Sequence, residues 1–264
     1  MIEQTFVAGL LRDRVAFVTG GGTGITGGIA RGMAQAGARV ALVSRRMEHL
    51  EPMAKSITDA GGEALAVTAD VRRPEEIETA IKQTVERFGK LDIVVNGAAG
   101  NFLCAAEELS PNGFGTVVDI DLKGTFNVCR AAFEHLKRQG GCILNISATL
   151  QLLGTPLQLH ASAAKAGVDT LTRGLAVEWG RYGIRTNAIA PGPIEDTEGF
   201  ARLVPAPVRE KLQRRIPLNR LGRIEDIAQS SVFLCSNAAS FINGAVLVVD
   251  GGHWLAANNL MGSA

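Results

Sequence analysis

The chain has 264 residues, of which 46% are apolar and 20% are charged, a composition typical of globular proteins. Its net charge of +1 gives no reason to expect nucleic acid or an anionic membrane as a partner. No apolar run approaches the roughly 18 residues that are needed to span a bilayer. The four cysteines lack metal-ligand spacing, so we expect reduced, packed thiols and no metal site.

Short apolar runs alternate with helical stretches along the chain. The runs are apolar at successive positions, as in Val40–Val43, which is typical of strands buried on both faces of a parallel sheet. The alternation predicts a doubly wound α/β fold, a Rossmann-type parallel sheet of about seven strands with helices on both faces. Predicted strands are Arg14–Gly20, Arg39–Arg45, Glu63–Asp70, Leu91–Ala98, Gly141–Ser147, Ile184–Pro191 and Ala245–Asp250, and predicted helices include Ile25–Ala36, Pro74–Phe88, Lys123–Gln139 and Ala161–Tyr182.

No linker, charge run or repeat divides the chain, so we expect a single domain over residues 1–264. The polar, proline-containing stretch Gly192–Pro217 is the one long segment that looks irregular. Long loops in such folds tend to be functional lids, and we interpret this stretch as a substrate lid within the domain.

A glycine-rich run ends the first predicted strand. It reads Gly20-Gly21-Gly22-Thr23-Gly24-Ile25, and a predicted helix follows at once. Glycines let the backbone approach a pyrophosphate, and the helix N-terminus offers free N–H groups and a positive dipole. A tight turn is the structural alternative, but the position in the first βαβ unit favours dinucleotide binding.

The end of the second predicted strand indicates which dinucleotide is bound. An NAD site usually carries an acid about 20 residues after the glycines, which binds the ribose 2′-hydroxyl. This chain has Ser44-Arg45-Arg46 there. Guanidinium groups bind a 2′-phosphate that a carboxylate would repel, so we predict NADP(H) as the cofactor, with a solvated basic helix start as the alternative.

Several spaced motifs together resemble the short-chain dehydrogenase/reductase family over nearly the whole chain. They are Thr19-Gly20-x-x-x-Gly24-Ile25, Asp70-Val71, Asn96-Gly97-Ala98-Ala99-Gly100, Lys165 on a helix, and Pro191-Gly192-Pro193-Ile194. The resemblance implies that Asp70 holds the adenine amino group and that Lys165 bonds the nicotinamide ribose. It also places further residues at the cofactor: Val71, Asn96, Ala98, Pro191, Gly192, Ile194 and Thr197.

The chain departs from that family at the catalytic positions. Most members carry a tyrosine four residues before the lysine as the proton donor, and here that position is Ala161. The usual serine and asparagine positions hold Ala148 and Asp121. The single tyrosine, Tyr182, lies roughly 25 Å along the predicted helix from Lys165 and cannot replace the missing acid.

A second departure lies in the glycine loop. The family usually has a third glycine where Thr26 stands. Gly22-x-Gly24-x-x-Gly27 offers a second glycine register, so we expect a locally reshaped loop that still binds the cofactor.

The losses at the catalytic positions resemble those of the peroxisomal-type 2,4-dienoyl-CoA reductases, which also replace the tyrosine and use an Asp and a Lys. The match includes Asn96–Glu107, Val117–Asn127 and Pro191–Gly199, whereas Leu150 stands where the mitochondrial branch carries a relocated tyrosine. By this resemblance the acyl-CoA contacts Arg72, Phe102, Ser110, Asn112 and Arg202.

The remaining polar groups suit hydride addition to a conjugated carbon. That reaction gives a dienolate, whose carbon can be protonated by a water held on a carboxylate. We predict that Asp121 holds this water beside Lys165, with a helix cap before Lys123–Gln139 as the alternative role for Asp121. The predicted activity is NADPH-dependent reduction of 2,4-dienoyl-CoA to 3-enoyl-CoA, which the resemblance makes an auxiliary step in unsaturated fatty acid β-oxidation.

Two other interpretations stay open. Ser147 and Thr149 flank the lost serine, so the enzyme could instead reduce another enoyl or keto thioester with a displaced acid. The chain could also be a non-catalytic NADP(H)-binding sensor that kept the fold and lost the catalytic tetrad.

We expect a homo-oligomer, a tetramer, because family members usually pair through the helices equivalent to Lys123–Gln139 and Ala161–Tyr182. The second of these carries small residues that permit close approach, namely Ala161, Ala163, Ala164, Ala166 and Gly167. The N-terminus lacks a basic region followed by an apolar core, and Gly262-Ser263-Ala264 is not a Ser-Lys-Leu type address. We therefore expect a cytoplasmic protein.

Overall fold

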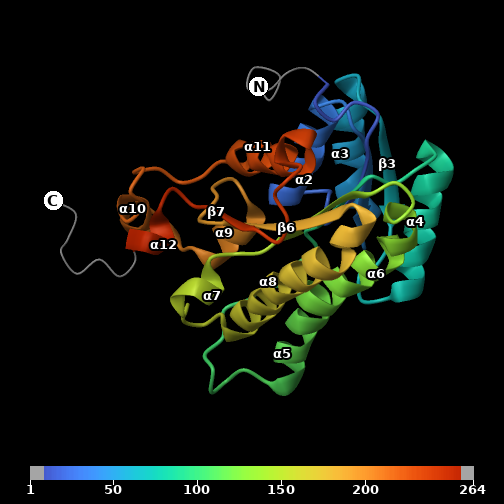
Figure 1. The fold of residues 1–264 in the computed structure, drawn as a ribbon. Coiled ribbons are helices and arrows are strands. Elements are labelled where there is room, and N and C mark those ends of the chain that lie inside the picture. The colour runs from blue at the N-terminus through green and yellow to red at the C-terminus, as the bar shows by residue number, and fades with distance from the viewer. Residues whose placement is uncertain (1–8, 257–264) are drawn as a thin grey trace.

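The computed structural model describes residues 9–256. Seven parallel strands form one sheet in the order β3-β2-β1-β4-β5-β6-β7 (Figure 1). The bounds are β1 Val15–Thr19, β2 Arg39–Ser44, β3 Ala64–Thr68, β4 Ile93–Asn96, β5 Gly141–Ile146, β6 Ile184–Pro191 and β7 Val246–Val249. The predicted fold class is confirmed.

The strand order reverses between β1 and β4, which is where open α/β sheets bind ligands. Thr19 pairs with Val43 of β2 on one side and with Asn96 of β4 on the other. The carboxyl ends of these three strands therefore lie level, and the loops that follow them meet at one edge of the sheet.

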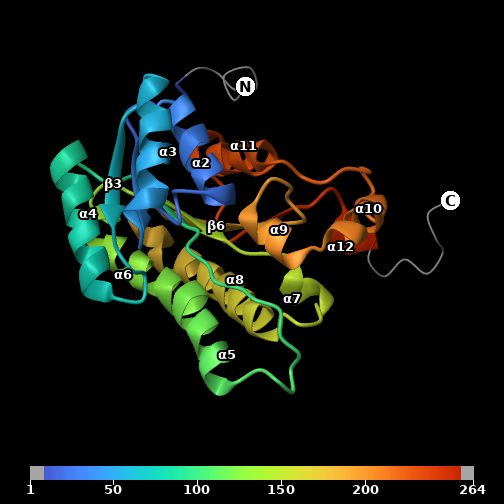
Figure 2. The same ribbon diagram turned by 180° about the vertical axis from the view of Figure 1, so that it is seen from behind.

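Helices cover both faces of the sheet (Figures 1 and 2). One face carries α2 (Gly24–Gln35), α3 (Met47–Asp59) and α11 (Ile224–Cys235), and the other carries α4 (Pro74–Phe88), α5 (Pro111–Val118), α6 (Gly124–Leu136) and α8 (Leu159–Trp179). Ala16 and Val18 belong to the hydrophobic cluster on the first face, and Val15 and Phe17 to the cluster on the second. Alternate side chains of a strand point to opposite faces, so burial of both faces requires apolar residues at successive positions.

The helix predicted over Lys123–Gln139 begins well before that position. α5 runs into a π-helical turn, Asp119–Lys123, which runs into α6, so one helical path extends from Pro111 to Leu136. Ser110 caps its start by accepting a hydrogen bond from the amide of Gly113. Pro111, Gly113 and Gly115 weaken the helical pattern, which explains why the sequence pattern did not indicate α5.

The prediction that Gly192–Pro217 is irregular is wrong in part. Two short helices lie within it, α9 (Glu198–Leu203) and α10 (Ala206–Arg214). Their polar composition leaves no helical apolar stripe to detect. Short elements elsewhere are α7 (Leu150–Leu153), α12 (His253–Ala256) and the 3₁₀ turns Gly180–Tyr182 and Asn237–Ala239. Within residues 9–256, no helix has both the length and the apolar character that a membrane crossing requires.

Candidate active site

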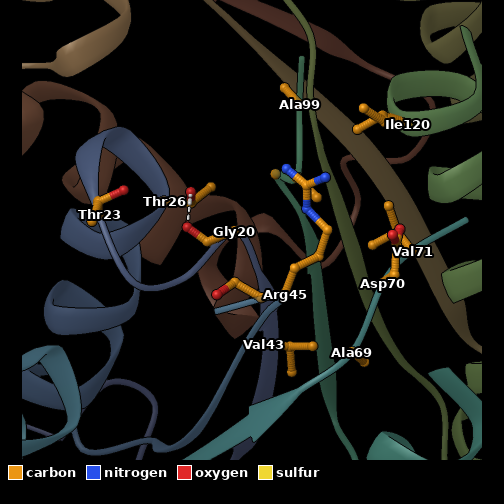
Figure 3. A pocket seen from close by; sticks show the side chains of 13 residues that line it. Gly20, Thr23, Thr26, Val43, Arg45, Ala69, Asp70, Val71, Ala99 and Ile120 are labelled. Atoms are coloured by element: carbon orange, nitrogen blue, oxygen red, sulfur yellow. Dashed lines mark hydrogen bonds between the residues drawn. The ribbon is translucent and has the colours of Figure 1, made fainter. Parts of the chain in front are cut away.

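A pocket lies at the carboxyl ends of the strands around the switch point (Figure 3). Its lining combines the glycine loop, the ends of β2 and β3, the loop after β4 and the π turn, namely Gly20, Thr23, Thr26, Val43, Ser44, Arg45, Ala69, Asp70, Val71, Gly97, Ala98, Ala99 and Ile120. Predicted cofactor residues in this lining are Gly20, Thr23, Ser44, Arg45, Asp70, Val71 and Ala98. Of the rest, Thr26, Gly97 and Ala99 belong to motifs named above, whereas Val43, Ala69 and Ile120 are apolar residues that give little signal in a sequence.

Thr26 fits into the glycine loop because the residue opposite it, Gly97, has no side chain. Its hydroxyl donates to the Gly20 carbonyl at 2.7 Å, the bond drawn in Figure 3. A Cβ atom at Gly97 would lie 1.9 Å from the Thr26 methyl carbon. The threonine therefore has room only because residue 97 has no side chain, and the predicted reshaping of the loop has a specific cause.

The other predicted glycine-loop residues, Gly22, Gly24 and Ile25, do not line the pocket. Gly22 faces α3, because a Cβ there would meet the His49 carbonyl oxygen at 2.6 Å. Gly24, with φ of +56°, begins α2, and Ile25 follows it in the first turn. These residues shape the turn between β1 and α2.

Arg45 is the guanidinium that enters the pocket. Its side chain extends between the glycine loop and Asp70 (Figure 3). Arg46 is instead the N-cap residue of α3, where its Nε lies 3.7 Å from Glu48 Oε1. The structure thus separates two arginines for which the sequence predicts the same role. A basic group at the end of β2 fits the 2′-phosphate of NADP(H).

Asp70 and Arg72 form an ion pair at the edge of the pocket. Arg72 Nε lies 3.0 Å from both carboxylate oxygens of Asp70. These hydrogen bonds hold the pKa of the Asp70 carboxyl below its ordinary value, against the opposing effect of burial. Asp70 is therefore an ionised acceptor suited to an amino group, while the Arg72 guanidinium is directed at Asp70.

Asn96 turns its side chain into the interior. Its Nδ2 donates to Asn145 Oδ1 at 2.8 Å and to Cys129 Sγ at 3.2 Å. Asn145 in turn donates to the Thr172 hydroxyl at 2.9 Å. Asn96 thus anchors the end of β4, and the residues after it reach the pocket.

The two predicted catalytic residues meet. Lys165 Nζ, on α8, lies 3.1 Å from Oδ2 of Asp121 in the π turn, with the side chains 10% and 1% exposed. The other carboxylate oxygen accepts from the Gly100 amide at 2.7 Å, and Lys165 Nζ donates to the Ile146 carbonyl at 2.9 Å. The helix-cap alternative for Asp121 is wrong, because the residue lies inside a continuous helical path.

Neither Ser147 nor Tyr182 supplies the acid that Ala161 lacks. The Ser147 hydroxyl donates to Asp169 Oδ1 at 2.6 Å, so its proton is already engaged. Tyr182 packs edge-on against the Phe133 ring at 5.4 Å, in the 3₁₀ turn after α8. Ala161 itself is buried in a small apolar cluster with Val117.

The predicted acyl-CoA residues are spread over four segments: Arg72 follows β3, Phe102 lies in the loop after β4, Ser110 and Asn112 lie at the start of α5, and Arg202 lies on α9. Phe102 follows the Gly100 amide that binds Asp121, and its ring stacks on that of His160 at 4.3 Å. Ser110 caps α5 and Asn112 lies exposed in its first turn. Arg202 is exposed on α9. Of these, Phe102 is the residue whose loop contacts the Asp121–Lys165 pair.

The segment after β6 lies beside a second hollow. The Gly192 amide donates to the Val249 carbonyl at 3.0 Å, just after Pro191 ends β6. Ile194 is buried and Thr197 caps α9 by accepting from the amide of Phe200. Thr197 lines the second hollow with Glu195, Asp196, Glu198, Phe200, Ala201, Arg209 and Leu221.

Comparisons with known proteins agree with this geometry. The family model described as Enoyl-(Acyl carrier protein) reductase matches residues 11–253. A crystal structure of a short chain dehydrogenase from Bacillus anthracis is 43% identical with a TM-score of 0.83, covering 91% of this chain and 96% of that one. The chain belongs to the short-chain dehydrogenase/reductase family.

Two further relatives bear on substrate and cofactor. A peroxisomal 2,4-dienoyl-CoA reductase of Saccharomyces cerevisiae, named as (3E)-enoyl-CoA-producing, is 49% identical over 256 residues, which are 96% of this chain and 88% of that protein. A gluconate 5-dehydrogenase from Burkholderia cenocepacia, crystallised with NADP and tartrate, is 33% identical with a TM-score of 0.86, covering 92% of this chain and 95% of that one.

Gly97→Ala should weaken NADPH binding, because the new methyl would collide with Thr26 at the pocket wall. Adding Thr26→Gly should restore much of the affinity, since it removes the group that collides. Fluorescence titration of NADPH with the wild type, both single variants and the double variant measures this coupling. Purely additive effects of the two substitutions would contradict the packing argument.

Proposed function

We propose that this protein is an NADPH-dependent 2,4-dienoyl-CoA reductase that forms 3-enoyl-CoA, an auxiliary step in the β-oxidation of unsaturated fatty acids. The observation that carries the proposal is the buried Asp121–Lys165 pair beside Ala161. The 49% identity to a reductase named for this activity supports it.

The chemistry explains why a conjugated thioester suits this site. A ketone reductase must protonate an oxygen, and Ala161 has no proton to give. NADPH bound in the pocket would supply a hydride to the far end of the diene. Asp121 would hold a water that protonates the carbon next to the thioester carbonyl, while Lys165 adds positive potential near the dienolate.

The alternatives are less well supported by the side chains. A displaced acid at Ser147 would need a free hydroxyl, but that hydroxyl donates to Asp169, which leaves Thr149 as the flanking hydroxyl for this alternative. A sensor would need the cofactor pocket but not a buried ion pair, whose desolvation costs free energy. An NADPH oxidation screen across 2-enoyl, 2,4-dienoyl and 3-keto thioesters tests all three interpretations, and binding without turnover would indicate a sensor.

The acyl-CoA should lie beside Phe102, with Arg72 and Arg202 available to its phosphates and Ser110 and Asn112 to its polar groups. Arg72 would then share its guanidinium between Asp70 and a phosphate. Residues 192–217 would close over the substrate, as part of a single domain over 1–264. The cytoplasmic location stays a prediction, which fractionation of cells can test.

Asp121→Ala should lower turnover of 2,4-dienoyl-CoA by roughly the 100- to 10,000-fold typical of an acid–base group. NADPH binding by fluorescence should change little, since Asp121 does not line the cofactor pocket. Asp121→Asn is the matched control of equal shape and should lose similar activity, whereas Lys165→Ala should impair both turnover and NADPH binding. Unchanged turnover in Asp121→Ala, where chemistry limits the rate, would disprove the mechanism.

Arg45→Ala should raise the KM for NADPH far more than the KM for NADH. Arg46→Ala should have a smaller effect, because Arg46 lies outside the pocket lining and pairs with Glu48. Steady-state kinetics with both cofactors measure this difference. Equal effects of Arg45→Ala on the two cofactors would defeat the assignment of the 2′-phosphate site.

We expect a homotetramer that pairs through α6 and α8. Ala161 and Ala164 pack inward, but Ala163, Ala166 and Val177 of α8 are exposed, and Phe126 of α6 is 49% exposed. Light scattering at micromolar concentration measures the assembly, and Val177→Asp should shift it toward smaller species. A wild-type monomer would rule out this assembly.

A further inference from the structure

Two segments beside the catalytic pair are fastened to each other. Loop 100–104 follows β4, and segment 157–160 leads into α8. Asn101 Nδ2 donates to Gln158 Oε1 at 2.6 Å, and the Cys104 amide makes a second link to a carbonyl of segment 157–160 at 2.9 Å. These links form a single wall next to the Gly100 amide that binds the catalytic carboxylate.

His160 is fully buried in this wall. Its ring stacks on Phe102 with centroids 4.3 Å apart and the planes 28° from parallel. Neither ring nitrogen has a hydrogen-bond partner among residues 9–256. The Phe102 carbonyl is close enough to favour the charged ring, but the nitrogens do not meet it in hydrogen-bonding geometry.

Burial lowers the pKa of His160 below its ordinary value, and the nearby negative charge of Asp121 only partly opposes this. The imidazole is therefore neutral at physiological pH, with one N–H donor and one acceptor. A neutral imidazole is known to polarise carbonyl groups in enzymes.

Two other side-chain donors near the catalytic pair are already engaged. Ser147 and Gln151 both donate to Asp169, each at 2.6 Å. Ala161, at the family's tyrosine position, has no donor. Among the described residues, His160 and the Ser162 hydroxyl are the buried donors at the start of α8 that lack a partner. Of these two, His160 is the one that stacks on the predicted acyl-contacting Phe102.

We propose that His160 is a further catalytic residue, which donates its imidazole N–H to the thioester carbonyl oxygen of the acyl-CoA. This inference rests on the proposed reductase function. Negative charge gathers on that oxygen as the dienolate forms, and a preorganised donor there stabilises the transition state. His160 transfers no proton: its hydrogen bond strengthens with the charge and weakens when water protonates the α-carbon.

The decisive variants are His160→Phe, which keeps an aromatic ring against Phe102 but removes the donor, and His160→Gln, which keeps a donor. His160→Phe should lower kcat on 2,4-dienoyl-CoA by about 100- to 1,000-fold, the usual effect of removing one oxyanion donor. His160→Gln should retain part of the activity that His160→Phe loses. NADPH affinity should be unchanged in both, and His135→Phe, a half-buried histidine on α6, is the control that should keep wild-type turnover.

A readout without turnover is the absorption spectrum of 2,4-dienoyl-CoA bound to the protein with NADP⁺. A hydrogen bond to the carbonyl polarises the conjugated thioester and shifts its absorption to longer wavelength. The wild type should show this shift and His160→Phe should lose it. If the variant does not fold, ¹⁵N NMR of the wild-type histidines decides, since the His160 ring signals must move when the thioester binds.

The outcomes separate this inference from the proposed function. A wild type that does not reduce any dienoyl-CoA overturns the proposed function itself. A wild type that is active, with His160→Phe equal to it in kcat and absorption shift, overturns only the role of His160. A loss in Ser162→Ala but not in His160→Phe would likewise overturn it and assign the donor to Ser162.

Discussion

The site depends on the buried ion pair between Asp121 and Lys165. Two charges removed from water lose hydration, and such a pair is tolerated only when the geometry is good and the remaining polar atoms are bonded. Here the Gly100 amide and the Ile146 carbonyl complete the bonding. The pair therefore joins the β4 loop, the π turn, the end of β5 and α8 at one point, and loss of either partner would leave a buried charge uncompensated.

The π turn explains how one helical path packs on α8 in its first part and on the sheet in its second part. The Gly124 amide donates to the Asp119 carbonyl, five residues back, instead of the usual four. This wider turn shifts the phase of α6 relative to α5, so that Val117 packs on α8 while Val128 packs on the sheet side. Asp121 lies within the turn, and its direction toward Lys165 is tied to that shift.

On both the cofactor side and the acyl side of the site, a residue that departs from the family pattern is accommodated by a neighbour. The family's usual third glycine is a threonine here, and Gly97 across the pocket leaves room for it. The family's usual tyrosine is an alanine, and a buried histidine beside it presents a donor that no described residue uses. Gly97 lies 71 residues from Thr26 in the sequence, whereas His160 directly precedes Ala161 on α8. In both cases a neighbouring residue in the site accommodates the change from the family pattern.

The sequence by itself determined the doubly wound fold, the glycine loop, the basic end of β2 and the loss of the tyrosine, because these are local patterns of periodicity and spacing. It also identified Asp121 and Lys165 as the candidate catalytic residues. Only the tertiary structure decided that they form an ion pair, that Arg45 and not Arg46 enters the pocket, and that His160 is buried without a partner. Each of these depends on the direction of a side chain, and packing between segments far apart in the chain sets that direction.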